Sequence, residues 1–212
     1  MARKEDVSDR ILSAALELAA IRGWRGLSLS EIAEEAGVPL ADVYGAFPSK
    51  AAILAGIIGR FDRRVLAGGA ADREESVRDR LFDVLMRRFD ALSPHKDAVA
   101  AILRDLPADP ATLLFTLPRL AISIAWMLEA AGLTCSGLRG AIRVKGVALI
   151  YLDTLRVWLR DDSEDMTRTM ARLDRDLRRA EGLVQRCCRW ERRSRAAADR
   201  GEGPQSEAPA EG

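Results

Sequence analysis

The stretch LSLSEIAEEAGVPLADVYGAFPSK, residues 27–50, decides the fold of this chain. Ser28 carries a hydroxyl that can cap a helix, and Glu31 follows at the three-residue spacing of a capping box. Gly37 stands where a helix ends in a left-handed residue, and a nearby proline cannot continue that helix. A second short helix is expected from about Leu40 to Ala46. This order of helix, tight turn and helix is the one that places a second helix in the major groove of DNA.

The rest of the chain also has the pattern of helices. Apolar residues recur with a helical period nearly everywhere, and no stretch alternates convincingly as a β-strand would. One helix is expected before residues 27–50 and a linking helix after them, ending near Gly68 and Gly69. The residues from 196 onward have the Gly, Pro, Glu and Ser content of a disordered end. The sequence therefore predicts an all-α protein with a tail at 196–212.

Composition and charge indicate an ordinary helical protein. The 212 residues include 33 Lys and Arg against 32 Asp and Glu, for a net charge of +1. Charged residues interrupt the apolar runs before the roughly 20 residues of a membrane span are reached, so we expect none. The N-terminus lacks the apolar segment of a secretion signal, and three cysteines, two of them adjacent, do not form a disulfide framework. We expect a cytoplasmic protein.

The distribution of charge is unusual for a DNA-binding protein. Residues 1–50 hold six Lys and Arg against eight Asp and Glu, whereas residues 167–195 hold ten Arg against four acidic residues. A surface that binds nucleic acid usually carries the excess of positive charge. Here the excess lies at the far end of the chain from the helix-turn-helix pattern.

Residues that would carry out catalysis or bind a metal are not apparent. The chain has no Gly-rich phosphate loop, no paired histidines, and no Ser or Cys with an obvious histidine partner. His95 is the only histidine, and one histidine does not make a metal site. We expect no enzymatic activity, no cofactor and no metal site.

A longer set of residues stands in an order known from one protein family. These residues are Ile11-Leu12-x-Ala14-Ala15-x-x-Leu18, then Gly23, then Ser28-x-x-Glu31-Ile32-Ala33-x-x-Ala36-Gly37-Val38, and finally Val43-Tyr44-x-x-Phe47-Pro48-Ser49-Lys50. With them, residues 8–60 resemble the N-terminal domain of the TetR family of bacterial transcriptional regulators. The resemblance implies a TetR-like all-α fold, with a helix-turn-helix DNA-binding domain at 1–50 and a helical ligand-binding and dimerisation domain at 51–195.

The same resemblance implies a set of DNA contacts. Phosphate contacts are expected from Ser28, Ser30, Tyr44 and Lys50, and contacts with base edges from Leu40 and Ala41. An exposed lysine beside a helix N-terminus suits a phosphate, which favours the contact at Lys50. The alternative is that Ser28 only caps its helix and that Tyr44 packs between helices.

The second helix of the motif departs from the family pattern. Leu40 replaces a polar residue early in the helix, Asp42 stands where the family usually has Thr, and Gly45-Ala46 replaces His-Tyr. Asp42 would bring a negative charge towards the phosphates unless it accepts a hydrogen bond from a cytosine amino group. Either the operator is read mainly through shape and apolar contacts, or DNA binding has been weakened.

A second resemblance lies in the C-terminal half, in the pattern Trp158-Leu159-x-x-Asp162-Ser163-x-Asp165-x-x-x-Thr169-x-x-x-Leu173-Asp174-x-x-Leu177. It is similar to a pattern in the TetR-fold lipid-binding proteins of ubiquinone biosynthesis. The alternative is that Asp162, Ser163 and Asp165 only cap a helix. The relation would imply a pocket for an apolar molecule, for which the sequence offers Phe82, Leu85, Phe89, Leu113, Leu114, Phe115, Trp126, Met127 and Leu149. Such apolar residues can equally be ordinary core.

The last helix combines apolar residues with many arginines. Leu183, Val184, Cys187 and Trp190 fall on one side, so this helix could lie in a lipid headgroup layer as a peripheral membrane contact. The alternative is that these residues seal the core or a dimer while the arginines are solvated. Proteins of the TetR type dimerise through their last two long helices, and the candidate dimer residues here are Leu138, Ile142, Leu149, Leu152, Leu155, Met166, Met170 and Leu173.

Taken together, the sequence predicts a TetR-type DNA-binding transcriptional regulator. We expect a ligand-responsive repressor that acts as a homodimer on a double-stranded DNA operator and binds an apolar small-molecule effector. The alternative, from another class of protein, is a TetR-fold lipid- or isoprenoid-binding accessory protein related to ubiquinone biosynthesis.

Overall fold

The computed structural model describes the backbone of residues 2–69, 72 and 74–201, and the side chains of residues 6–69, 72 and 74–186. Within these ranges all regular structure is helical, as predicted. Two 3₁₀ turns, η1 (Ser93–His95) and η2 (Leu106–Ala108), flank the sixth helix. The α-helices are α1 (Ala2–Arg22), α2 (Leu29–Ala36), α3 (Leu40–Ala46), α4 (Lys50–Leu66), α5 (Val77–Leu92), α6 (Lys96–Asp105), α7 (Pro110–Ala130), α8 (Gly137–Trp158) and α9 (Thr167–Gly201).

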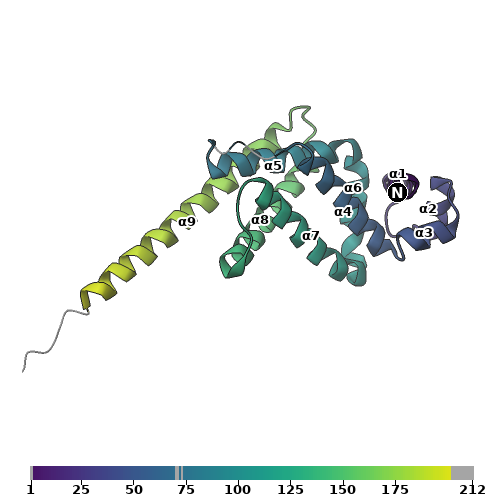
Figure 1. The fold of residues 1–212 in the computed structure, drawn as a ribbon. Coiled ribbons are helices and arrows are strands. Elements are labelled where there is room, and N and C mark those ends of the chain that lie inside the picture. Colours follow the sequence, from purple (N-terminus) through teal and green to yellow (C-terminus); the bar gives the residue numbers. More distant parts are fainter. Residues whose placement is uncertain (1, 70–71, 73, 202–212) are drawn as a thin grey trace, which may run out of the picture.

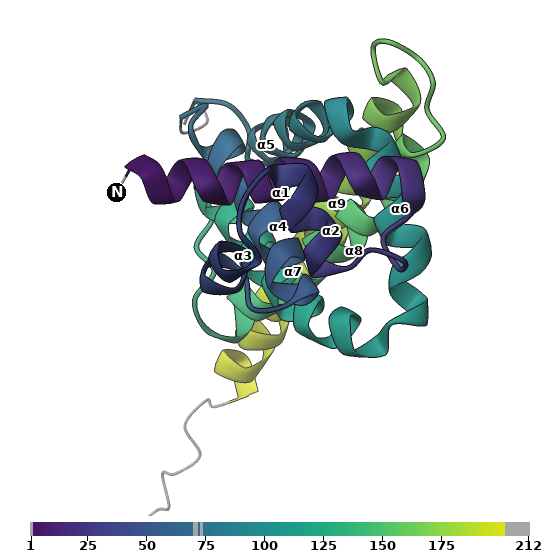
Figure 2. The ribbon, with the colours of Figure 1, turned by 90° about the vertical axis from the view of Figure 1, so that its right-hand side faces the viewer.

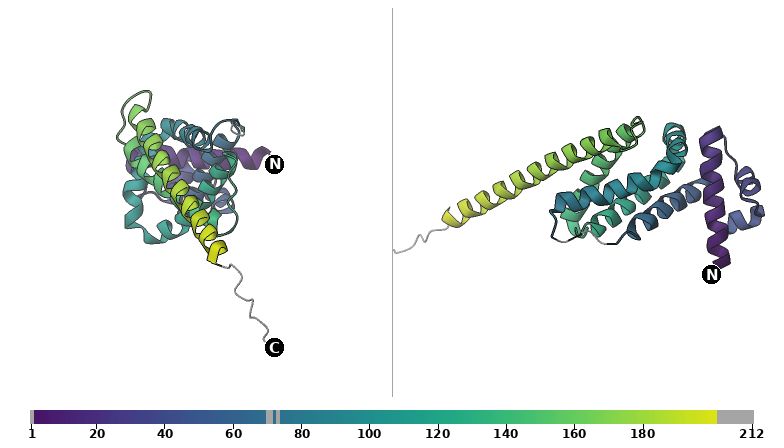
Figure 3. Two further views of the ribbon diagram at one scale, coloured as in Figure 1. Left: turned by 90° about the vertical axis from the view of Figure 1, so that its left-hand side faces the viewer. Right: turned by 90° about the horizontal axis from the view of Figure 1, so that it is seen from above.

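The molecule is elongated, with α1–α3 forming a head at one end (Figure 1). Helices α4–α8 form the body, and α9 extends well beyond it on the side opposite the head. Seen from the head, α1 lies across the front of the body (Figure 2). The view from above shows α1 running nearly perpendicular to the body helices and to α9 (Figure 3).

The start and the end of α2 confirm the helix-turn-helix prediction. The backbone N–H of Glu31 donates to Ser28 Oγ at 3.2 Å, and the backbone N–H of Ser28 donates to Glu31 Oε2 at 2.9 Å, so the capping box is complete. Gly37 ends α2 with φ +60°, a conformation that residues with a Cβ rarely adopt. The turn to α3 is therefore set by local chemistry.

A second glycine allows the head to pack on α4. Gly56 lies inside α4, and a Cβ at this position would come within 2.6 Å of the Phe47 ring. The absence of a side chain lets Phe47, at the end of α3, rest directly against α4. Helix α3 is further held by Val43, which is fully buried in a core with Ile11 and Ile32. Each such side chain contributes roughly 1.5–3 kcal/mol by burial.

The head and the body share one continuous core. Buried apolar residues form a single cluster from Ile11 in α1 to Leu177 in α9, and α1 packs along α6. The expected division of the chain at residue 50 therefore remains a prediction. The helical backbone of α9 continues through residues 196–201, which we had assigned to the tail, and residues 202–212 lie outside the described part of the chain.

Helix α7 is more apolar than the sequence analysis allowed for. Its 21 residues meet the length and composition of a membrane span, although we expected no such segment. Core helices of soluble proteins can have the same length and composition. In α7, 33% of the most apolar stretch of 18 residues is buried inside the protein. Moreover, Arg119 in the middle of α7 donates to Asp62 of α4 at 3.0 Å. The helix packs here as a member of the bundle.

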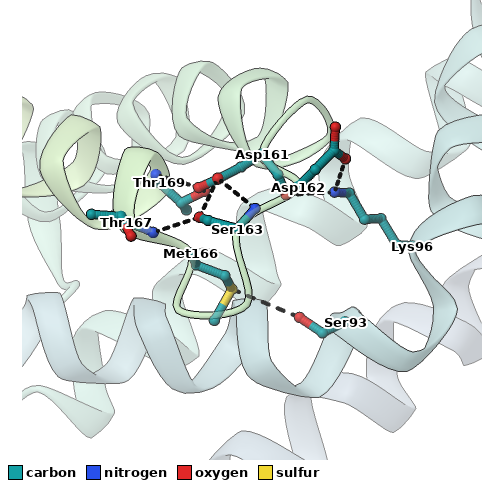
Figure 4. A network of polar contacts seen from close by, with 8 residues as sticks. All are labelled: Ser93, Lys96, Asp161, Asp162, Ser163, Met166, Thr167 and Thr169. Carbon is teal, nitrogen blue, oxygen red and sulfur yellow. Dashed lines mark hydrogen bonds and ion pairs between the residues drawn. The ribbon is translucent and has the colours of Figure 1, made fainter.

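The turn between α8 and α9 is organised by one buried carboxylate, Asp161 (Figure 4). Its Oδ1 accepts from the hydroxyl of Ser163 at 2.6 Å, and its Oδ2 accepts from the backbone N–H and the hydroxyl of Thr169, both at 2.8 Å. The hydroxyl of Ser163 in turn accepts from the N–H of Thr167. Of the three residues in the capping alternative, Ser163 thus takes part in the cap, whereas Asp162 and Asp165 are exposed and Asp162 pairs with Lys96.

These contacts make Asp161 sensitive to pH. Burial alone would raise the pKa of this carboxyl, but the hydrogen bonds from Ser163 and Thr169 outweigh it and lower the pKa from 3.8 to about 2. Because the folded-state pKa lies below the unfolded value, the stabilisation is complete above pH 4. It is lost as the pH falls from about 4 to about 2.

We expect Asp161→Ala to lower the free energy of unfolding by about 1–3 kcal/mol at pH 7, because the backbone N–H and hydroxyl groups of both Ser163 and Thr169 lose their acceptor. Urea denaturation followed by circular dichroism measures this change. Asp162→Ala is the matched control, since its exposed carboxylate should contribute less than about 1 kcal/mol. Equal effects of the two substitutions would contradict the role given to Asp161.

Candidate DNA-binding surface and ligand cavity

Helix α3 has a buried side and an open side. Val43 is fully buried, whereas Leu40 and Tyr44, four residues apart and thus on one face, are 52% and 72% exposed. Together with Ala41 they line a shallow open hollow whose other wall is formed by Leu29 and Ser30 of α2. The structure thus brings four of the six predicted DNA-contact residues onto one surface. The alternative that Tyr44 packs between helices is wrong.

The other two predicted contact residues are held by the protein itself. The hydroxyl of Ser28 accepts from the N–H of Glu31 and donates to its Oε2 at 2.7 Å, so Ser28 acts as a cap. Lys50 was expected to be exposed, but it is half-buried. Its ammonium donates to the carbonyls of Trp24 at 2.7 Å and Arg25 at 3.2 Å and lies 5.2 Å from the centre of the Trp24 ring. Burial lowers the pKa of Lys50.

Other basic residues of the head are also engaged. Arg10 donates to the carbonyls of Ala36 and Gly37, where it supports the turn between α2 and α3, and Arg22 pairs with Glu31 at 2.9 Å. The Arg25 side chain, in the loop before α2, is exposed. Sequence reasoning did not single out Arg25, because a lone arginine in a loop carries no periodic or motif signal.

The loop at Trp24 and Arg25 also joins the head to the body. The carboxylate of Asp105, at the end of α6, accepts from the backbone N–H groups of Trp24 at 2.8 Å and Arg25 at 3.0 Å. The hydrogen bond from Arg25 lowers the pKa of Asp105, so this carboxylate stays charged at neutral pH. With Lys50 on its other side, the loop is fixed between α4 and α6.

An apolar cavity of about 290 Å³ lies within the body. It is lined by α4, α5, α6, η2, α7 and α8 and is partly open to solvent, and the residues that line it are apolar except Arg88, Thr116 and Tyr151. The apolar lining comprises Leu54, Ile57, Ile58, Phe61, Leu92, Val99, Ile102, Leu103, Leu106, Pro107, Leu113, Leu117, Leu120, Leu152 and Leu155.

Of the nine residues predicted to form the pocket, Leu113 lines the cavity, Leu114 and Leu149 are exposed, and the other six lie elsewhere. Leu85, Phe89 and Met127 are fully buried in the core, and Phe82 is partly buried against it. Phe115 and Trp126 are exposed on α7. None of these six lines the cavity. Helical periodicity indicates which face of a helix is apolar, but it does not indicate whether that face meets another side chain, a void or solvent.

The described residues offer no metal site: no group of three His, Cys, Asp or Glu side chains that could hold an ion occurs among them. On α9, Leu183 and Val184 are exposed, as the membrane-contact hypothesis requires. The side chains of Cys187 and Trp190, the other members of that apolar stripe, lie outside the described residues.

Comparison with known proteins agrees with this geometry. The family model for bacterial regulatory proteins of the tetR family matches residues 11–57, the segment from α1 to the first half of α4. A TetR transcriptional regulator from Nitrosomonas europaea is 25% identical in sequence and superposes with a TM-score of 0.66, covering 82% of this chain and 97% of that one. Residues 11–57 thus form a DNA-binding domain of the TetR family.

Other solved structures share the fold of this TetR protein. A TetR transcriptional regulator from Rhodococcus sp. is 22% identical with a TM-score of 0.62, covering 82% of this chain and 95% of that one. A tetR-family regulator from Streptomyces coelicolor is 21% identical with a TM-score of 0.60 and covers 95% of this chain and 91% of that one. No curated protein matches the sequence.

With this domain and this fold, the chain is a DNA-binding transcriptional regulator of the TetR type. The surface formed by Ser30, Leu40, Ala41 and Tyr44 is open to solvent. It is unusual in its charge, because Asp42 is exposed in the first turn of α3, where phosphates would approach.

We expect Asp42→Asn to raise the affinity for any duplex about three- to tenfold at low salt, because it removes a negative charge that faces the phosphates. Fluorescence anisotropy with a labelled random duplex measures the change. The control is Glu17→Gln, which changes the net charge of the protein by the same amount as Asp42→Asn. Glu17 lies on α1, close enough to His95 of the body for the two side chains to interact electrostatically, and not on α3. A loss of affinity in Asp42→Asn would instead favour a hydrogen bond from a base to Asp42.

Proposed function

We propose that this TetR protein is a ligand-responsive repressor that acts as a homodimer on a double-stranded operator. The observation that carries the proposal is the open face of α3, where Leu40, Ala41 and Tyr44 lie beside Ser30. Apolar and hydroxyl groups predominate on this face. We therefore expect thymine methyl groups and groove shape to contribute more to operator choice than charged hydrogen bonds do.

Ligand response is supported by the way in which the cavity and the head are connected. Helix α6 lines the cavity through Val99, Ile102 and Leu103 and ends in Asp105, which holds the loop before α2. A ligand that displaces α6 would move this carboxylate and the loop with it. The head would then change its position relative to the body, a shift that requires the ligand to bind the two arrangements with different affinity.

Dimerisation is supported by an exposed apolar stripe on α8. Leu138, Ile142 and Leu149 lie at helical spacing, and each is more than 60% exposed. Of the other residues that we expected in the dimer contact, Leu155 and Leu173 are buried within the chain itself, and Leu152, Met166 and Met170 are partly buried. A second copy that packs on the α8 stripe would remove three large apolar side chains from water and bring two heads to one duplex.

A lipid- or isoprenoid-binding accessory protein is the second candidate. The observation that favours it is the exposure of Phe115, Ile122 and Trp126 along one side of α7, in addition to the apolar cavity. One observation counts against it. The turn between α8 and α9, whose sequence is similar to that of the lipid-binding proteins, forms a helix cap through Asp161, Ser163 and Thr169, and this structural role explains the pattern without a lipid.

A salt titration on genomic DNA fragments tests the regulator. We expect a sequence-selective fraction to stay bound at physiological salt. On the selected operator, Tyr44→Ala should lower affinity about tenfold, and Tyr44→Phe should show how much of this loss belongs to the hydroxyl. Ile122→Ala, at an equally apolar exposed position on α7, is the control. Binding that is sequence-blind and lost at physiological salt would support the second candidate.

The dimer is tested by sedimentation equilibrium. We expect the unchanged protein to sediment as a dimer and Ile142→Asp combined with Leu149→Asp to sediment as a monomer, because buried unpaired carboxylates are costly. Both positions are exposed in the single chain, so circular dichroism should show that the variant folds. Ile122→Asp is the matched control on α7. A dimer that survives the double substitution would place the contact elsewhere.

A further inference from the structure

Arg88 and Tyr151 form the polar end of the cavity, and behind Arg88 lies one carboxylate between two guanidinium groups. Asp62 Oδ1 accepts from Arg88 Nη1 at 2.5 Å, and Asp62 Oδ2 accepts from Arg119 Nη2 at 3.0 Å. The hydroxyl of Ser123 also donates to Oδ1. Asp62 and Arg88 are both buried. Since arginine stays protonated in proteins, this cluster carries a net charge of +1 next to an apolar void.

Arg88 still has hydrogen-bonding capacity on the cavity side. Its Nε donates to the hydroxyl of Tyr151 at 3.1 Å and its Nη1 donates to Asp62, but Nη2 has no hydrogen-bond partner among the described residues. Arg88 and Tyr151 both line the cavity. The Tyr151 hydroxyl accepts from Arg88, which leaves its own proton free for an acceptor.

The third polar residue of the lining is already satisfied as a donor. The hydroxyl of Thr116 donates to the carbonyl of Thr112 in its own helix at 2.7 Å. The polar end therefore offers donors from Arg88 and Tyr151 and an uncompensated positive charge. A ligand that fits must supply acceptors and one negative charge there, and an aliphatic body for the remaining lining.

We infer that the cavity binds a monoanionic amphiphile, a straight-chain aliphatic carboxylate of medium length, with its carboxylate held by Arg88 and Tyr151. The inference rests on the proposed ligand-responsive function and names the class of its effector. A planar carboxylate accepts two parallel hydrogen bonds well, and a charge-assisted bond is about twice as strong as a neutral one.

Other ligand classes fit the same features less well. A cation would meet the excess positive charge, and a neutral alkane or alcohol would leave that charge uncompensated in an apolar site. A phosphate monoester or a nucleotide would bury more negative charge than the cluster can balance. The volume of about 290 Å³ lies at the lower end of ligand pockets, which favours a medium chain over a long one.

The same geometry implies how the ligand would act on the head. Asp62 belongs to α4, which begins at Lys50 beneath the head, and a ligand carboxylate would compete with Asp62 for Arg88. Arg119 would still balance Asp62 after such an exchange. Helix α4 would then lose one of its two buried ion-pair contacts with the rest of the body while the core stays neutral.

Isothermal titration calorimetry on the full chain tests the inference with octanoate, decanoate and dodecanoate as probes. We expect decanoate to bind at least about tenfold more tightly than decanol, and decyltrimethylammonium to bind no more tightly than decanol. Equal affinities for decanoate and decanol would overturn the inference, as would preferred binding of the cation.

Two variants localise the carboxylate. Tyr151→Phe keeps the ring, which stacks 5.5 Å from Phe89, and should weaken decanoate about five- to tenfold while leaving decanol unchanged. Arg88→Met should abolish the preference for decanoate. The control is Arg87→Met, which removes the same charge from α5 at a residue that does not line the cavity and binds the Gly69 carbonyl.

If Arg88→Met does not fold by circular dichroism, Tyr151→Phe decides the question alone. Decanoate binding that neither variant changes would overturn the inference. These titrations contain no DNA, so they test only the ligand class. The proposed function is tested separately, by the measurement of operator binding. A protein that binds its operator but not decanoate would disprove only the ligand class.

Discussion

The pairing of Asp62 with Arg88 and Arg119 is the interaction on which the body of this protein depends. It ties α4 to α5 and α7, and the hydrogen bond from Arg88 to Tyr151 adds α8. Removal of one partner from a buried ion pair typically costs 3–5 kcal/mol, because a charge is left unpaired in an apolar environment. Four of the helices that line the cavity are therefore held together by charge and hydrogen bonding beside it.

The head depends on the body through a different kind of contact. Asp105 and Lys50 hold the backbone of Trp24 and Arg25 from two sides, and α1 lies along α6. Helix α3 is thus fixed to α1 and α2 by apolar packing, with Phe47 at its end resting on α4, and the loop before α2 is fixed to α6 by hydrogen bonds. Any movement of α6 reaches the head through these two hydrogen bonds and the α1 contact.

Much of the head could be predicted from the sequence, because its signals are local. The capping box of Ser28 and Glu31, the left-handed Gly37 and the span of α3 depend on residues within a few positions of one another, and all three predictions were confirmed. The open face of Leu40 and Tyr44 followed from the family resemblance. The exposure of Lys50 was predicted wrongly, since its partners Trp24 and Arg25 are distant in sequence and no periodic pattern connects them.

The sequence by itself determined the helices, the family and the turn that presents α3. Only the tertiary structure decided where the cavity lies, which polar residues line it, and that Asp161 instead of Asp162 organises the turn before α9. The physical reason is that the spacing of apolar residues in the sequence indicates only which face of each single helix is apolar. A void, a buried ion pair or a shared cap arises where faces from several helices meet, and the distances between those faces are fixed only when the bundle is packed.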